Sequence, residues 1–165
     1  MATSQAPRRE GTRWLTAEQQ RHWRAYLEGA ARLTEALNRQ LERDAGLSLS
    51  EYEILVRLSE AAGRAARMSE LAKSLVQSRS RISHTVTRLE QRGLVARRTY
   101  PGDGRGVSCV LTDRGFEVLA AAAPGHVGAV RAALVDRIAD AQLRALGEVM
   151  SAVAPADSSS VRPPS

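Results

Sequence analysis

The sequence predicts a mainly helical α+β protein in which a helix-turn-helix and a β-hairpin lie between long flanking helices. Three observations predict this fold class. Apolar residues recur at helical spacing over most of the 165 residues. Two short helical segments, 68–75 and 79–92, are joined by the turn 76–78. Two β-favouring segments, 94–99 and 107–111, enclose a glycine-rich turn.

A long first helix is expected within residues 12–47. It follows residues 1–11, which lack apolar periodicity and read as a disordered tail. Thr16 and Gln19 have the spacing of a capping box, in which each side chain satisfies a free amide at a helix start. Gly46 suits the left-handed position that ends a helix.

The segment 48–112 is expected to form a separate lobe. Ser50 and Glu53 have capping-box spacing and predict the start of a short helix. Residues 61–67 are expected to be a connection to the helix-turn-helix. Ser78 can cap the second helix of that motif, which should end before the glycine that follows it.

The C-terminal segment 113–154 is expected to form further helices. Thr112 can cap the first of them, and Asp113 complements its dipole. Pro124 is expected to kink or interrupt this helix, because proline cannot donate the backbone hydrogen bond. Residues 155–165 are rich in serine and proline and read as a second disordered tail.

The charge of the chain favours a polyanionic partner. The formal net charge is +6, and the segment 78–114 holds eight arginines but three acidic residues, so most of the excess lies there. No apolar run approaches the roughly 20 residues of a membrane span, and no secretory signal is evident. We therefore expect a soluble, cytoplasmic protein without a membrane partner.

Catalytic and metal chemistry are not indicated. The single cysteine, Cys109, excludes an intrachain disulfide and should be a buried, inert thiol. His22, His84 and His126 are too far apart to give ligand spacing, so no metal or cofactor is expected. Paired carboxylates, a cysteine-histidine pair and a phosphate loop are not evident at suggestive spacing, which disfavours an enzyme.

The order of elements resembles the MarR family of bacterial winged helix-turn-helix regulators over about residues 16–154. The motifs that carry the resemblance are Leu71-Ala72, Ser80 to Ser83, Leu89-Glu90 with Gly93-Leu94-Val95, Asp103-Gly-Arg105, and Leu111-Thr112 with Gly115. The turn departs from the family, since Val76-Gln77 stands where many relatives have glycine. The resemblance implies a winged helix-turn-helix with long N- and C-terminal dimerisation helices.

The resemblance also implies a homodimer that binds a double-stranded DNA operator. Two recognition helices would enter successive major grooves of a pseudo-palindromic site. Physical reasoning agrees, because a twofold dimer reads half-sites about 34–36 Å apart, whereas one recognition helix reads only a few base pairs. The first helix and the region 126–153 are expected to form the interface, since their apolar stripes exceed what one lobe can bury.

Candidate DNA-binding residues lie on the predicted recognition helix and on the hairpin, or wing. Arg81 and His84 share one face and are expected to contact base edges, or phosphate in the case of His84. The alternative is an ordinary solvated basic face. The family pattern implies that Arg105 enters the minor groove and that Asp103 shapes the wing tip. The full candidate set is Ser78, Arg79, Ser80, Arg81, Ser83, His84, Arg88, Asp103 and Arg105.

Other positions allow two interpretations. His22, Trp23 and Tyr26 either contact a small aromatic or phenolic effector, as the resemblance implies, or belong to the dimer core. Arg97 and Arg98 are either phosphate contacts or solvated strand residues. Oxidant sensing by a cysteine near the first helix, as in some relatives, is disfavoured because none is present there.

The expected function is therefore a dimeric, sequence-specific transcription regulator, and more specifically a ligand-responsive repressor. Two other classes remain open. A non-specific nucleic-acid architectural protein would bind any duplex in a salt-sensitive way. A winged helix that serves as a protein-interaction module would show no operator affinity.

Overall fold

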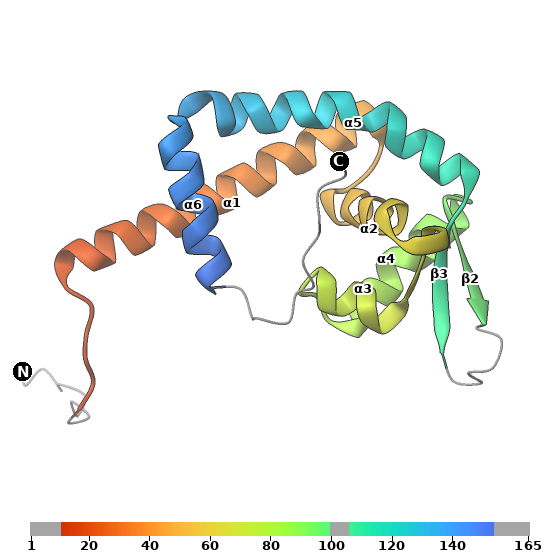
Figure 1. Ribbon diagram of the computed structural model, residues 1–165, viewed down its shortest axis with the longest axis horizontal. Coiled ribbons are helices and arrows are strands. Elements are labelled where there is room, and N and C mark those ends of the chain that lie inside the picture. Colours follow the sequence, from red (N-terminus) through yellow and green to blue (C-terminus); the bar gives the residue numbers. More distant parts are fainter. Residues whose placement is uncertain (1–10, 100–105, 154–165) are drawn as a thin grey trace, which may run out of the picture. The chain divides into compact units, whose positions relative to one another are not determined.

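The computed structural model describes residues 11–99 and 106–153 (Figure 1). The predicted tails 1–11 and 155–165 lie outside this part except for Gly11. The described chain forms two compact units, one up to Arg32 and one from Leu33, and each is described by itself. The elements are α1 (Ala17–Ala45), α2 (Leu49–Glu60), the 3-10 turn η1 (Ala62–Arg64), β1 (Ala65–Arg67), α3 (Met68–Ser74), α4 (Arg79–Gln91), β2 (Val95–Thr99), β3 (Val107–Leu111), α5 (Asp113–Ala133), the 3-10 turn η2 (Val135–Arg137) and α6 (Asp140–Val153).

The first unit contains the beginning of α1. The capping box predicted there is confirmed: the backbone N–H of Gln19 donates to Oγ1 of Thr16 over 3.1 Å, and the N–H of Thr16 donates to Oε1 of Gln19 over 2.9 Å. Trp23 and Tyr26 stack with their ring centroids 5.7 Å apart, and both side chains are about half exposed. The start of α1 therefore presents aromatic surface to solvent in the single chain.

Helix α1 ends at Gly46, which has a φ of +62° as predicted for a left-handed terminator. The predicted start of the next helix was wrong by two residues. Ser48, not Ser50, caps α2: its Oγ accepts from the N–H of Glu51, and Oε2 of Glu51 accepts from the N–H of Ser48 over 2.8 Å. Both serines have an acid three residues later, so the pattern alone did not decide between them.

Helices α3 and α4 form the predicted helix-turn-helix. Ser78 caps α4 as expected, with its Oγ accepting from the N–H of Arg81 over 3.2 Å. In the turn, Val76 has a φ of +50°, a left-handed conformation that is strained for a β-branched residue. This geometry explains why glycine would suit the position at which this chain departs from its family.

The sheet has three antiparallel strands in the order β1-β3-β2. Strand β1 was not predicted: the end of the segment 61–67, expected to be a connection, pairs with β3, placing Ala66 opposite Cys109. Val95 pairs with Leu111 at the base of the wing. The sheet thus joins the wing to the segment that leads directly into α3 (Figure 1).

A close contact fixes the start of α5 against the base of the wing. Oγ1 of Thr112 donates to the carbonyl oxygen of Gly93 over 2.8 Å and accepts from the N–H of Gly115 over 3.0 Å. A Cβ on Gly115 would lie 2.0 Å from the carbonyl oxygen of Leu94. Only glycine fits here, which gives a physical reason for the Leu111-Thr112 and Gly115 motif.

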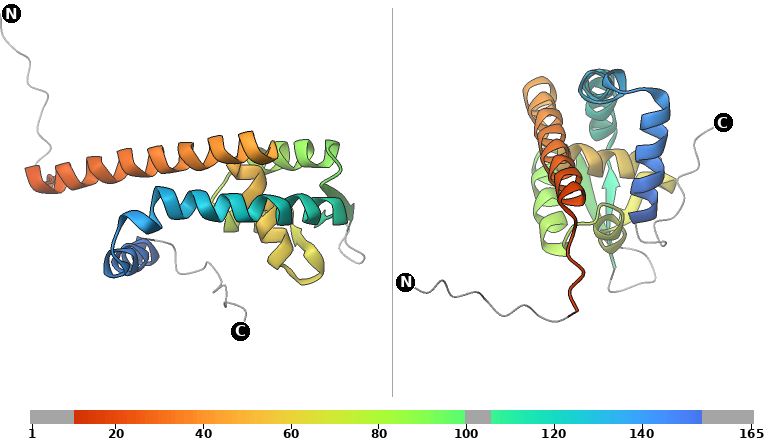
Figure 2. Two further views of the ribbon diagram at one scale, coloured as in Figure 1. Left: turned by 90° about the horizontal axis from the view of Figure 1, so that it is seen from above. Right: turned by 90° about the vertical axis from the view of Figure 1, so that its left-hand side faces the viewer.

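Pro124 does not interrupt α5, contrary to one of the two outcomes expected. The helix continues to Ala133, and the break comes later, at η2. Figures 1 and 2 show α6 turning away from the direction of α5 after this break. The missing N–H of one proline is therefore tolerated within a helix that has 21 residues.

The segment Asp113–Arg137 is long and apolar enough to cross a membrane by length and composition alone. The expectation that no run approaches this length was therefore too strict. Helices of the same composition occur in soluble proteins, so the segment is weak evidence for a membrane. Leu119 and Ala122 on α5 are buried in the core of the second unit.

Candidate nucleic-acid interface

Helix α4 is anchored by one face and exposed on the other. The buried face consists of Ile82, Thr85, Val86 and Leu89. Thr85 satisfies its hydroxyl within the helix by donating to the carbonyl oxygen of Arg81 over 3.0 Å. The seven candidate residues of α4 and its cap are all exposed: Ser78, Arg79, Ser80, Arg81, Ser83, His84 and Arg88.

The cations in the N-terminal half of α4 are uncommitted. Arg79 and Arg81 make no side-chain hydrogen bond or ion pair with the described part of the chain. One carboxylate lies close enough to be influenced by Arg81: burial raises the pKa of Glu53, and the charges of Arg57 and Arg81 oppose that rise. This half of the helix therefore presents guanidinium groups that are available to an external anion.

Arg88, in the C-terminal half, is paired. Its Nε donates to Oε1 of Glu51 over 3.2 Å, and the Glu51 side chain is only 8 % exposed. One turn further on, Nη1 of Arg92 donates to the carbonyl oxygen of Gly46 over 3.0 Å and lies 3.7 Å from Oε2 of Glu51. The prediction that Arg88 contacts DNA stays a prediction, and the structure shows a partner for it within the protein.

The interpretation of Arg97 as a solvated strand residue is wrong, because its side chain is only 27% exposed and binds α4. Its Nη2 donates to the carbonyl oxygen of Ser83 over 3.0 Å and to Oγ1 of Thr87 over 2.9 Å. Its backbone N–H and its Nη1 both donate to the carboxylate of Glu90. These bonds from Arg97 hold the pKa of Glu90 below its usual value, the backbone bond contributing most. Arg97 therefore links the wing to the exposed helix.

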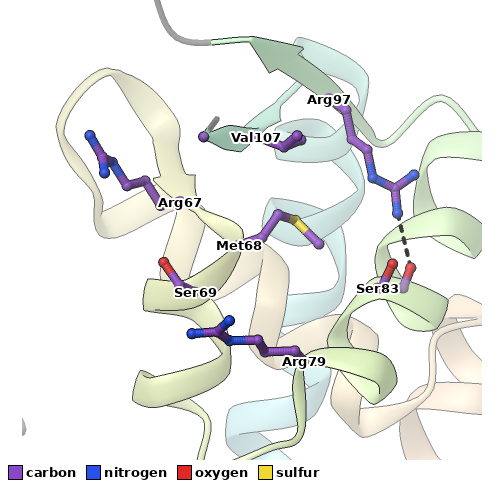
Figure 3. A pocket seen from close by; sticks show the side chains of 8 residues that line it. Arg67, Met68, Ser69, Arg79, Ser83, Arg97 and Val107 are labelled. Atoms are coloured by element: carbon purple, nitrogen blue, oxygen red, sulfur yellow. Dashed lines mark hydrogen bonds between the residues drawn. The ribbon is translucent and has the colours of Figure 1, made fainter. Parts of the chain in front are cut away.

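A groove of about 570 Å³ lies between the wing, the start of α3 and the start of α4 (Figure 3). Arg79 lines it from α4 and Arg67 from the residue before α3. Met68 and Val107 form an apolar part of its wall, and Ser69 and Ser83 contribute hydroxyl groups. The groove is thus concave, basic and partly apolar.

A second groove, of about 550 Å³, lies along α3, the turn and the start of α4, and it shares Ser69 and Arg79 with the first groove. Its lining includes Lys73, Ser78 and Arg79. Oε1 of Gln77, which also lines it, is buried without a hydrogen-bond partner in the described structure. Cationic and hydroxyl groups therefore lie next to the N-terminus of α4, where they suit phosphate contacts, with the carboxylate of Glu70 as the acidic part of the lining.

Asp103 and Arg105, the candidate residues of the wing tip, lie outside the described residues. Their expected roles stay predictions. Described wing residues close to the tip are Arg98 and Thr99, which are exposed, and Val107, whose side chain is 43 % exposed.

The expected effector residues lie together on the first unit. His22 is exposed and has its Nε2 3.8 Å from Oε1 of Glu18, one helical turn earlier. Trp23 and Tyr26 stack as described above. Neither of the two grooves is lined by these residues, and whether they contact an effector or a second chain stays a prediction.

Cys109 is completely buried on β3, and burial raises its pKa to about 12. A thiol in this state is protonated at neutral pH and unreactive. No group of three metal-binding side chains occurs within residues 11–99 and 106–153.

Comparisons with known proteins agree with this architecture. A sequence profile described as the MarR family matches residues 45–106. Sco3205, a MarR family transcriptional regulator from Streptomyces coelicolor solved in complex with DNA, is 48% identical, with a TM-score of 0.85, over 92% of this chain and 97% of that one. The chain belongs to the MarR family.

Two other solved structures extend the comparison. AbsC, a MarR family transcriptional regulator from Streptomyces coelicolor, is 42% identical with a TM-score of 0.81, over 86% of this chain and 95% of its own. CouR from Rhodococcus jostii RHA1, solved bound to p-coumaroyl-CoA, shares the fold at 23% identity and a TM-score of 0.69, over 78% of this chain and 88% of that one. Among curated protein sequences no match is found.

Reasoning from the sequence missed the residues that hold α4 in place. The candidate residues did not include Glu51, Arg92 and Arg97. All three are charged residues whose partners lie on other elements. A signal was available for Glu51, since it stands three residues after Ser48 and so fits a capping box. No local pattern indicates that the arginines pair within the protein.

Proposed function

We propose that this MarR family protein is a soluble, cytoplasmic transcription regulator that binds a pseudo-palindromic DNA operator as a homodimer and acts as a ligand-responsive repressor. One observation carries the DNA-binding part. The N-terminal half of α4 presents uncommitted Arg79 and Arg81 beside a basic groove, while its opposite face is anchored in the core. A 48% identical relative that was solved with DNA supports the proposal.

In this proposal the roles differ along α4. Arg81 and His84, one turn apart, contact base edges in the major groove, where arginine binds guanine through two hydrogen bonds. The N-terminal group consisting of Ser78, Arg79, Ser80 and Ser83 contacts phosphates or bases. Arg105 contacts the minor groove, with Asp103 shaping the wing tip.

The dimer is supported by apolar side chains that the single chain leaves exposed. On α1, Trp23 is 52% and Leu27 47% exposed. On the second unit, Val127 and Val149 are each 56% exposed. Burying such groups against a second copy would stabilise the dimer by roughly 25 cal/mol for each Å² of apolar surface. Twofold symmetry would then provide two copies of α4 for two half-sites.

The ligand response rests on family membership and on the cluster His22, Trp23 and Tyr26. An effector releases DNA only if it binds more tightly to a conformer whose recognition helices are wrongly spaced. Aromatic rings with polar edges suit an aromatic or phenolic molecule.

The test begins by selecting bound fragments from the source genome and footprinting the best of them. A short palindromic protected site supports the proposal. Light scattering of the protein–DNA complex should then give a mass that corresponds to two chains per site. Arg81→Ala should weaken operator binding by roughly 1 to 3 kcal/mol and relax base preference. Arg105→Ala should weaken binding through the wing, and Arg57→Ala on α2 serves as the matched control.

Two other results would overturn the proposal of an operator-binding regulator. Uniform, salt-sensitive binding to any duplex would indicate an architectural protein. Absence of duplex binding would indicate a protein-interaction module. If an operator is found, screening small molecules for its release tests the ligand response separately.

A further inference from the structure

The C-terminal half of α4 meets the junction between α1 and α2 at a buried carboxylate. Glu51 is 6 % exposed, although glutamate is rarely buried without partners. Its Oε2 accepts from the N–H of Ser48 over 2.8 Å and from Oγ of Ser48 over 3.1 Å. Its Oε1 accepts from Nε of Arg88 over 3.2 Å. Oε2 is therefore bonded by Ser48 at the start of α2, and Oε1 is bonded by Arg88 on α4.

Arg92 adds a second contact between α4 and the junction of α1 and α2. It lies four residues after Arg88, so both guanidinium groups leave the same face of α4. Nη1 of Arg92 donates to the carbonyl oxygen of Gly46, where α1 ends, and lies 3.7 Å from Glu51. Two successive turns of α4 are thus held by the end of α1 and the start of α2.

The two halves of α4 therefore differ in their electrostatics. Arg79 and Arg81 make no side-chain hydrogen bond or ion pair in the described structure, although the charge of Arg81 acts on Glu53, whereas Arg88 and Arg92 share one buried carboxylate. The Arg88 side chain is 57% and the Arg92 side chain 39% exposed, so both cations are accessible from solvent although Glu51 itself is buried. An uncompensated arginine contributes to binding at any sequence, because phosphates carry no sequence information.

We propose that Glu51 is a positioning residue for DNA reading: it fixes the orientation of α4 against the α1–α2 junction and withholds Arg88 and Arg92 from DNA phosphates. This inference rests on the proposed function and assigns Arg88 to positioning in place of direct DNA contact. Specificity then depends on Glu51 in two ways. The orientation of α4 determines which base edges Arg81 reaches, and the withheld charges limit non-specific affinity.

The experiment compares Glu51→Gln with the parent. The amide oxygen can still accept from Ser48, but the charge that holds the arginines is lost. We expect the ratio of operator affinity to random-duplex affinity to fall by about tenfold or more. We also expect the slope of log affinity against log salt concentration on random duplex to steepen by about one for each arginine that is released.

A second variant keeps the test decisive if Glu51→Gln folds poorly. Arg88→Gln combined with Arg92→Gln also removes the link, but it removes the cations too. The affinity ratio should fall here as well, while the salt slope on random duplex should not steepen. A loss of stability alone would reduce the active fraction of both variants without steepening the salt slope of Glu51→Gln.

The matched control is Glu60→Gln, which removes one carboxylate from the same helix α2, where Glu60 pairs with Arg57 at 3.9 Å. It changes the net charge by the same amount as Glu51→Gln. It should leave the ratio of operator to random-duplex affinity and the salt slope near the parent values. If Glu51→Gln behaves like Glu60→Gln while the parent discriminates its operator, the inference is wrong and the proposed function stands. If the parent itself does not discriminate, both are overturned.

Discussion

Arg97 on β2 holds Glu90 on α4 at two points: its backbone N–H donates to Oε1 of Glu90 over 2.9 Å, and its guanidinium binds Oε2. The same guanidinium donates to the carbonyl oxygen of Ser83 and to Oγ1 of Thr87. One side chain of the wing therefore reaches two turns of α4.

Arg97→Met should lower the free energy of unfolding by about 1 to 3 kcal/mol, because several hydrogen bonds to a half-buried guanidinium are lost and their acceptors are left unpaired. Urea unfolding followed by circular dichroism measures the change. Arg98→Met provides the control, since Arg98 is exposed on the same strand and should change stability by about 0.5 kcal/mol or less. Equal effects of the two substitutions would contradict this role of Arg97.

Acid should weaken the link between Arg97 and Glu90. The pKa of Glu90 is lowered in the folded protein, so its contribution to stability is present above the unfolded value of 4.5 and is lost as the pH falls through the folded value. The difference in unfolding free energy between the parent and Glu90→Gln should therefore shrink as the pH falls from about 5 to about 3. Urea titrations of both proteins at several pH values measure it, and a difference that grows on acidification would contradict the assignment.

Gly115→Ala should destabilise the protein by about 3 kcal/mol or more, because the added Cβ would lie 2.0 Å from a backbone carbonyl oxygen that cannot move aside easily. Thermal unfolding at fixed protein concentration measures the loss. Gly128→Ala on the same helix is the control. A Cβ there meets nothing within 4 Å in the single chain, so alanine should be neutral or stabilise α5 by about 0.5 to 1 kcal/mol.

Val76→Gly should stabilise the turn of the helix-turn-helix. Relief of a left-handed β-branched residue is worth about 1 to 3 kcal/mol, and the added chain entropy of glycine in the unfolded state costs about 0.5 to 1 kcal/mol. The side chain is 86% exposed, so little apolar burial is lost. Chemical unfolding should show a net gain of about 1 kcal/mol, within the range of about 0 to 2.5 kcal/mol that these two terms allow, for glycine and a smaller gain for Val76→Ala, which keeps the Cβ. A loss of stability in both would show that the turn is not strained.

Local signals predicted much of the fold. Thr16, Ser78 and Thr112 each cap a helix as expected, because a cap depends on side chains within three residues of the amides that they satisfy. The choice between Ser48 and Ser50 was different. Two overlapping capping boxes compete there, and the one that forms places Glu51 where Arg88, 37 residues further along, can bind it.

Non-local pairing explains the other differences. Strand β1 has three residues and no β-favouring pattern, so only its pairing with β3, more than 40 residues later, makes it a strand. The exposed face of α4 could be predicted because apolar periodicity defines the opposite face. The pairing of Arg88 and Arg92 within the protein could not be predicted, because their partners Glu51 and Gly46 come from a different part of the chain.

The central position of β3 also bears on how the protein behaves when it is concentrated. Val107–Leu111 is an apolar strand rich in β-favouring residues, of the kind that can associate with other chains through an open edge. Within the described sheet it has no open edge, because β1 and β2 pair with it on both sides. The outer strands carry Arg67, Arg97 and Arg98, and charged edges resist further pairing. The apolar central strand is thus enclosed by two strands that carry arginines.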